Sequence, residues 1–184
     1  MGTRVIALLA ILGGVGWAIW PIPQALVGRE WPAGEPVSTL LFFSVVGGTW
    51  LLAGATLGLV SMFADRIRGG AALLGSLGAM TGAFSVFGAF GAIVALPLGS
   101  AALAWDLGRA GVLGPRLSRA HVAAAVLFLI LIAVIFGNPA LYDDRATAVP
   151  LLMLAIPYAF SWIAIGWSLR HGAPVPERPV EKAS

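Results

Sequence analysis

The chain has 184 residues, of which 59% are hydrophobic and only 10% are charged. A soluble globular domain has about a quarter of its residues charged, so this composition excludes an ordinary soluble domain, a disordered chain and a coiled coil. The absence of cysteine excludes a disulfide framework, a thiolate metal site and a cysteine nucleophile. A net charge of +3 combined with 7 Trp and 9 Phe residues indicates a lipid environment and not nucleic acid.

Several stretches without a charged residue are long enough to cross a hydrocarbon core, which requires about 20 apolar residues. In chain order they are Val5–Gly28, Pro36–Ala64, Gly69–Trp105, Val122–Tyr142 and Ala146–Leu169. The third would form a single helix about 55 Å long, which is too long for a core of about 30 Å at any ordinary tilt. Because closely spaced glycines at 87–91 permit a tight reversal, we predict that this stretch forms two helices.

The distribution of basic residues tests this division independently, since Lys and Arg favour the cytoplasmic side of short loops. With six spans and a cytoplasmic N-terminus, only Arg29 and Arg145 of the 11 Lys and Arg residues lie outside. With five spans, most of the 11 would lie outside, so the charges favour six.

The predicted fold is all-α: a polytopic integral membrane protein that forms a six-transmembrane-helix bundle with cytoplasmic N- and C-termini. Residues 1–171 form a single transmembrane domain, and residues 172–184, which are rich in proline, form a disordered cytoplasmic tail. The predicted helices span about 4–22, 37–64, 70–87, 91–108, 120–138 and 146–169.

Small residues and prolines inside the predicted helices bear on packing. The pairs Gly54/Gly58 and Gly78/Gly82 each place two glycines on one helix face, where two backbones can approach closely. We interpret them as packing the second predicted helix against the third, with homodimerisation through the same surface as the alternative. Pro97 and Pro157 each remove a helical hydrogen bond, and we predict kinks at both.

Ionisable residues all fall at the ends of the predicted helices or in loops. Such residues at membrane depth usually mark functional sites, so their absence argues against a proton-coupled pump. His121 follows Arg116 and Arg119 and is interpreted as a residue at the level of the lipid headgroups. Trp17 is assigned to the outer membrane interface.

The outer loops and one tryptophan supply the candidate ligand-binding residues. Trp50 lies near the middle of a predicted helix, so its indole N–H needs a partner, either a local hydrogen bond or a ligand in a cavity. The candidate set consists of Glu30, Trp31, Trp50, Tyr142, Asp143 and Asp144. The acidic residues lack regular ligand spacing, so we predict solvated charge or a loop–loop ion pair, no metal site and no cofactor.

No acid, base and nucleophile converge, so we expect no enzyme activity. The predicted function is that of a small non-catalytic multi-pass protein of a bacterial inner (plasma) membrane, acting as an accessory subunit or a helix bundle that binds a partner or lipid. Expected partners are membrane lipids and another protein or a second copy of the chain, and nucleic acid is not expected.

An alternative function follows from a resemblance at the level of fold. The size, the six spans, the cytoplasmic ends and Trp31 in the first outer loop resemble the substrate-binding subunits of energy-coupling-factor vitamin transporters. This resemblance implies a substrate-binding component of a transporter for a neutral or hydrophobic small molecule.

Overall fold

A computed structural model describes residues 2–19, 21, 43–83, 89–138, 140–143, 149–150 and 153–172, with the side chains of 43, 89–92 and 142–143 excepted. Over these residues the protein is entirely helical and contains no strand. The elements are α1 (Thr3–Ile19), the π-helix η1 (Phe43–Gly47) that leads into α4 (Gly48–Met62), α5 (Gly69–Ala83), α6 (Ala89–Arg109), α7 (Pro115–Gly137), the short α8 (Ala140–Asp143) and α10 (Ile156–His171). The expectation of an all-α fold with six main helices is confirmed over this part of the chain.

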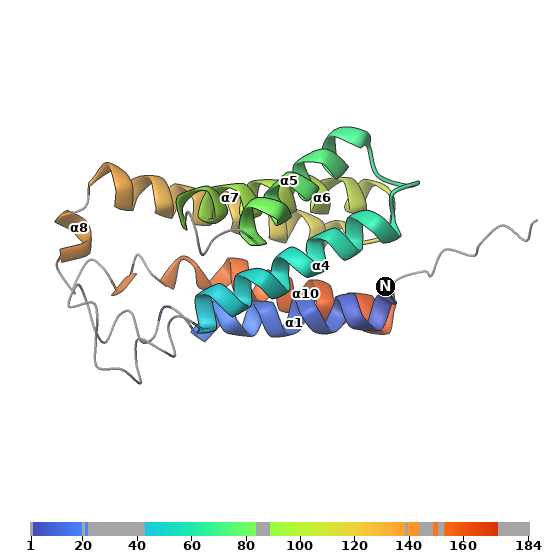
Figure 1. The fold of residues 1–184 in the computed structure, drawn as a ribbon, viewed down its shortest axis with the longest axis horizontal. Helices are drawn as coiled ribbons and strands as arrows, with labels where there is room; N and C mark the ends of the chain where they lie inside the picture. The colour runs from blue at the N-terminus through green and yellow to red at the C-terminus, as the bar shows by residue number, and fades with distance from the viewer. Residues whose placement is uncertain are drawn as a thin grey trace, which may run out of the picture.

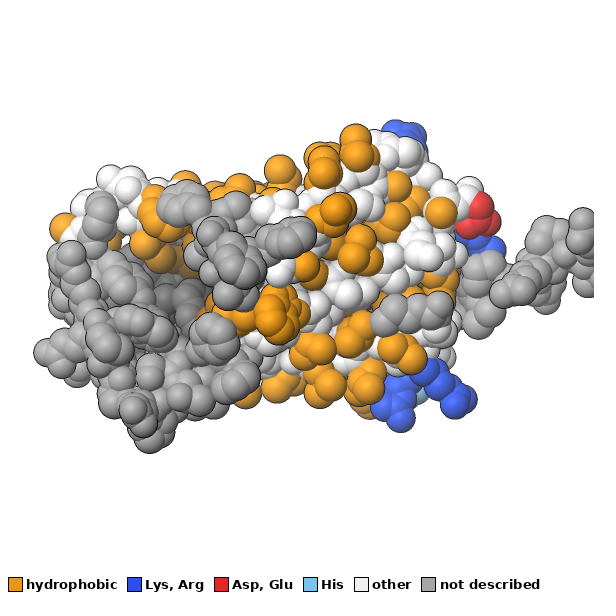
Figure 2. All heavy atoms as spheres, in the orientation of Figure 1, with side chains coloured by type: hydrophobic (Ala, Val, Ile, Leu, Met, Phe, Trp, Pro, Cys, Tyr) orange, Lys and Arg blue, Asp and Glu red, His pale blue; other side chains and the backbone are white. Residues whose placement is uncertain are grey.

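The six main helices run antiparallel to their neighbours in sequence (Figure 1). Each packs against the preceding and the following helix, and α10 packs against α1, so that the bundle closes into a ring. The start of α1, the α4–α5 and α6–α7 connections and the end of α10 therefore lie at one end of the bundle (Figure 1). We call this the arginine end, because the arginines of the described residues lie near it (Figure 2).

The long apolar stretch between residues 69 and 105 does divide into two helices, as predicted. It contains α5 and the larger part of α6, which pack closely along one another. The reversal comes slightly earlier than expected, because α6 already begins at Ala89. Residues 84–88 lie outside the described part of the chain.

The connection from α6 to α7 is short because a glycine ends α6. Gly111 has φ of 73°, the left-handed conformation that ends many helices and that residues with a Cβ rarely adopt. The N–H groups of Val112 and Leu113 both donate to the carbonyl of Leu107 and so satisfy the last turn of α6. Pro115 then begins α7 at the one place in a helix where its missing N–H costs nothing.

Glycines allow the helices to approach closely, though with partners that differ from the expected ones. A Cβ at Gly78 would collide with the carbonyl oxygen of Ala95 in α6, and Gly54 lies beside Leu9 of α1. Gly82 lies between Thr49 of α4 and Leu96 of α6, and Gly58 is buried in α4. The expectation that these residues pack α4 against α5 is therefore wrong for Gly54 and Gly78, because small-residue spacing reveals a contact face without revealing which helix covers it.

The two predicted proline kinks have different outcomes. Pro97 lies inside α6 and is buried, whereas Pro157 is the second residue of α10. Residues 149–150 and 153 are also helical, and a turn at 154–155 separates them from α10, which begins at Ile156, so the helical structure is interrupted directly before Pro157. Its missing N–H falls in the first turn, where no helical hydrogen bond is lost.

Candidate functional site

A cluster of polar side chains lies buried between α6, α7 and α10. Its centre is His121 of α7, which is 0% exposed and bonds through both ring nitrogens. Nδ1 lies 2.8 Å from the hydroxyl of Ser161 in α10, and Nε2 lies 3.1 Å from the hydroxyl of Ser100 in α6. The hydroxyl of Tyr158 in α10 completes the cluster, 3.0 Å from that of Ser100. We call these four residues the histidine cluster.

Backbone carbonyls accept further hydrogen bonds from the histidine cluster. The Ser161 hydroxyl donates to the carbonyl of Tyr158 at 2.6 Å, and the Ser100 hydroxyl reaches the carbonyl of Pro97 at 3.1 Å. Hydroxyls that bond back to the preceding turn of their own helix are held in one rotamer. The cluster therefore holds the imidazole by both of its nitrogens.

The histidine cluster has more hydrogen-bond contacts than it has protons to donate. The cluster has five contacts: imidazole to Ser161, imidazole to Ser100, Tyr158 to Ser100, and one serine-to-carbonyl contact for each serine. A neutral imidazole supplies one proton, and the three hydroxyls supply one each. There is one contact more than there are protons, so the Ser100 proton is shared between the Pro97 carbonyl and Nε2 of His121.

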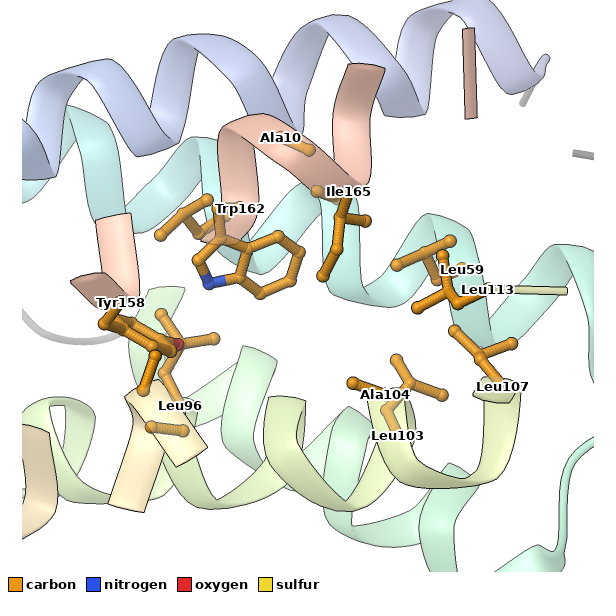
Figure 3. Close-up of a cluster of buried hydrophobic side chains, with 14 of the residues drawn as sticks. Ala10, Leu59, Leu96, Leu103, Ala104, Leu107, Leu113, Tyr158, Trp162 and Ile165 are labelled. Atoms are coloured by element: carbon orange, nitrogen blue, oxygen red, sulfur yellow. The ribbon is translucent and has the colours of Figure 1, made fainter. Parts of the chain in front are cut away.

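Aromatic rings pack against the histidine cluster. Trp162 stands edge-on to His121 with ring centroids 5.0 Å apart, and Phe128 stacks on Tyr158 at 5.5 Å. Figure 3 shows Tyr158 and Trp162 pointing from α10 into the space between α10 and α6, with Leu96 opposite Tyr158. The buried indole N–H of Trp162 forms no hydrogen bond to the described residues. These rings contribute to the complete burial of His121 and Tyr158.

Trp17 belongs to this group of rings and not to the outer membrane interface, so that assignment is corrected. It is buried, lies 5.1 Å from Phe128 between ring centroids, and donates from Nε1 to the hydroxyl of Thr49 at 3.1 Å. The interface assignment rested on its position near the end of α1. Because Gly13, Gly14 and Gly16 bring α4 and α10 close to this end of α1, the indole turns inward.

A second buried ionisable residue lies at the arginine end. Asp106 in the last turns of α6 is 7% exposed, and its Oδ2 accepts the backbone N–H of Arg68 at 2.6 Å. The Nε of Arg68 lies 4.0 Å from Oδ1. Arg68 directly precedes α5, so this carboxylate fixes the start of α5 to the end of α6. The side-chain partner of Arg68 is therefore on another helix.

Of the ligand-binding residues expected from the sequence, the structure describes the side chain of Trp50 alone. Glu30, Trp31 and Asp144 lie outside the described residues, as do the side chains of Tyr142 and Asp143, whose backbone belongs to α8. Trp50 is 52% exposed, and its indole N–H donates to the carbonyl of Ala83 at 3.0 Å. Of the two alternatives for the Trp50 indole N–H, the structure shows the hydrogen bond within the protein.

The histidine cluster is the site that sequence reasoning missed. The assignment of His121 to the headgroup level was wrong, because it rested on the neighbouring arginines and not on the helix face. The periodicity of α7 contained the signal: His121, Ala125, Phe128 and Ile132 recur at helical spacing and are all buried. The face that carries Val126 and Ile130 is exposed.

The described residues contain no group of three or more His, Asp or Glu side chains that could hold a metal ion. A comparison of the chain with known protein families, with curated proteins and with solved structures finds no match.

Proposed function

We propose that the protein is a multi-pass inner-membrane helix bundle with a cytoplasmic arginine end, which binds lipid or a partner protein and has no catalytic activity of its own. The observation that carries this proposal is the outer surface of the ring. Every main helix exposes at least one large hydrophobic side chain, as Leu8, Leu73, Leu98, Ile130 and Phe160 illustrate, and Figure 2 shows such side chains over the middle of one face of the bundle. A monomeric soluble protein rarely exposes apolar patches larger than a few hundred Å².

The length of the helices supports the same proposal. Two described helical segments, Ser44–Met62 and Pro115–Gly137, are long and apolar enough to cross a membrane by length and composition, and α1 is apolar but shorter. The remaining main helices pack beside these two in the same ring and expose the same kind of side chain. A membrane that surrounds one helix of such a ring would meet the others at the same depth.

The orientation follows from the charges at the arginine end. The described arginine side chains lie near this end, whereas the middle of the bundle shows hydrophobic side chains (Figure 2). They are Arg4, Arg66, Arg68, Arg109, Arg116, Arg119 and Arg170. Under the positive-inside rule, the arginine end faces the cytoplasm.

The non-catalytic part of the proposal rests on the histidine cluster. Catalysis by His121 would require a substrate group within hydrogen-bond reach of a ring nitrogen. Both nitrogens already contact serine hydroxyls, and the imidazole is fully buried. The same observation ranks a substrate-binding component of a transporter second, because a solute would have to displace these internal hydrogen bonds.

Cysteine accessibility tests the membrane proposal, and the chain has no cysteine of its own to interfere. Three single substitutions sample the bundle: G114C in the α6–α7 connection, N138C at the far end of α7, and I130C on its exposed apolar face. We expect the protein in the membrane fraction after an alkaline wash. A membrane-impermeant maleimide should label N138C in intact cells and G114C only after permeabilisation, and it should label I130C in neither case.

Two results would contradict the proposal. A protein that stays in the soluble fraction is not an integral membrane protein, and equal labelling of G114C and N138C in intact cells rules out the antiparallel spans. Purification in mild detergent tests the partner-binding part separately. A monodisperse monomer without bound lipid or protein would exclude that part.

A further inference from the structure

Two adjoining hollows, which together we call the seam, lie on the outer surface of the bundle at the arginine end, one between α6 and α7 and the other between the start of α5 and α6. On α6, Leu98, Ala101, Ala102, Trp105, Gly108 and Arg109 follow one another at helical spacing. The facing residues of α7 are Pro115, Ser118, Arg119 and Val122. The residue spacing from Arg109 to Leu98 corresponds to about 16 Å along the helix, or roughly half of a hydrocarbon core.

The end of the seam is a basic hollow of about 270 Å³. Arg109 from the last turn of α6 and Arg119 from the first turns of α7 line it, together with Trp105 and Ser118. None of the residues that line this hollow is acidic. Two guanidinium groups beside an indole at the membrane interface match the chemistry of a phosphate-containing headgroup.

The second hollow, of about 520 Å³, extends from Arg68 and Asp106 at the arginine end to the apolar side chains of Leu74 and Leu98, and we call it the apolar hollow. Leu74 of α5, Leu98 and Ala102 of α6 and Val122 of α7 line it, and Trp105 lines both hollows. Its one acidic residue, Asp106, is already bonded to Arg68. The small side chains of Ala101 and Ala102 leave the groove open, so an extended hydrocarbon chain fits the shape and the polarity.

We propose that the seam binds one anionic diacyl phospholipid, with its phosphate at Arg109 and Arg119 and an acyl chain in the apolar hollow beyond Trp105. This proposal rests on the proposed membrane location and names the lipid class that the bundle selects. A small phosphorylated solute would leave the apolar hollow empty, and a zwitterionic lipid would carry an ammonium group toward two arginines. The adjoining basic and apolar hollows together favour an anionic lipid.

The test measures lipid binding to the full chain in detergent, where no membrane surface adds a non-specific attraction. Dioleoyl phosphatidylglycerol and dioleoyl phosphatidylcholine are titrated separately, and bound lipids are counted by native mass spectrometry. We expect one phosphatidylglycerol to bind at least tenfold more tightly than phosphatidylcholine. Glycerol phosphate at millimolar concentration should not displace it.

Two variants locate the site. R109Q/R119Q removes both guanidinium groups and should weaken phosphatidylglycerol binding about thirtyfold, since each basic residue near an anionic lipid contributes about 1 kcal/mol. The matched control R66Q/R170Q makes the same charge change at the same end but outside the seam, and should change the affinity less than about twofold. A102F fills the apolar hollow and should weaken the binding of both lipids.

The results that would contradict the lipid site can be told apart from one another. Equal weakening by R109Q/R119Q and R66Q/R170Q shows a general attraction to a basic surface, and displacement by glycerol phosphate shows a site for a soluble phosphate compound; either result overturns the proposal. A protein that occupies the seam in place of lipid overturns it as well. If no lipid binds while G114C and N138C label on opposite sides, the lipid site fails and the membrane bundle stands.

Discussion

His121 and Asp106 are both buried ionisable residues, but they lie in contrasting surroundings. His121 lies about 9 Å along α7 from the start of the helix, and its partners are hydroxyls. Asp106 lies at the arginine end, and its partners are a backbone N–H and the exposed side chain of Arg68. Among the described residues, the buried carboxylate thus lies beside an exposed guanidinium group, whereas the buried imidazole lies among hydroxyls and aromatic rings.

This difference has an energetic reason. An ionised group loses several kcal/mol of solvation on burial, which only a charge partner and hydrogen bonds offset. Neutral hydroxyls and an imidazole need hydrogen bonds alone, and the histidine cluster supplies them from three helices. Substitutions in the two regions should therefore differ in size and in their response to conservative replacement.

The largest effect is expected for His121→Ala. This substitution leaves a cavity and removes the partner of two buried serine hydroxyls, so the free energy of unfolding in detergent should fall by about 3 kcal/mol. Denaturant titration followed by circular dichroism measures it. His171→Ala is the matched control, because His171 is exposed and should change the stability by less than about 0.5 kcal/mol. If both substitutions lower the free energy of unfolding equally, the histidine cluster contributes no more to stability than an exposed histidine does.

A smaller loss is expected for Asp106→Ala. It deletes the acceptor of the Arg68 N–H and should lower the free energy of unfolding by about 2 kcal/mol. Asp106→Asn keeps an oxygen at the same place and should lose about half as much. Asp65→Ala, at an exposed position in the same connection, should have little effect. If Asp106→Asn loses as much as Asp106→Ala, the charge and not the hydrogen bond holds the start of α5.

Tyr158→Phe removes a single hydroxyl from the histidine cluster and keeps the ring that stacks on Phe128. We expect a loss of about 1 kcal/mol, the usual net value of one buried hydrogen bond. The loss should disappear when Ser100→Ala is already present, because Ser100 is the side-chain partner of that hydroxyl. An undiminished loss in the double variant would mean that the hydroxyl acts through another contact.

The last prediction concerns a difference in stability between two variants, Trp17→Phe and Trp162→Phe. Both indoles are buried, but that of Trp17 donates to Thr49, whereas that of Trp162 has no hydrogen-bond partner among the described residues. Once the shared loss of ring volume is subtracted, Trp17→Phe should cost about 1 kcal/mol more. The same denaturant titration compares the two variants. Equal losses would show that the indole N–H of Trp162 has a partner of similar strength.

Much of the fold could be predicted because it depends on local properties of the sequence. Apolar length predicted the helices, and the distribution of arginines divided the stretch between residues 69 and 105 correctly. The predicted helix at 146–169 is not continuous, because a turn at residues 154–155 separates α10 from the helical residues 149–150 and 153. Composition alone cannot show where hydrogen-bonded helix begins within an apolar stretch.

The candidate site could not be predicted in the same way. His121, Ser100 and Ser161 are separated by 21 and 40 positions, and each is an ordinary residue within its own helix. Ser100 and Ser161 were visible as hydroxyls inside apolar helices, but nothing indicated that they meet the same imidazole. Helical spacing shows which face of α7 is buried without showing what lies opposite.

The sequence by itself determined that this chain is helical, that it forms six main helices over its described part, and that its basic residues collect at one end, because helix length and charge placement are local properties. Only the tertiary structure decided that α10 closes the ring against α1 and α7, which brings Tyr158 and Ser161 to His121, and that the packing of α6 on α7 places Arg109 beside Arg119. The physical reason is that a helix with apolar residues on several faces can be covered by any neighbour. The close approach of glycine-containing surfaces, at Gly14 with α10 and Gly78 with α6, selects which neighbour it is.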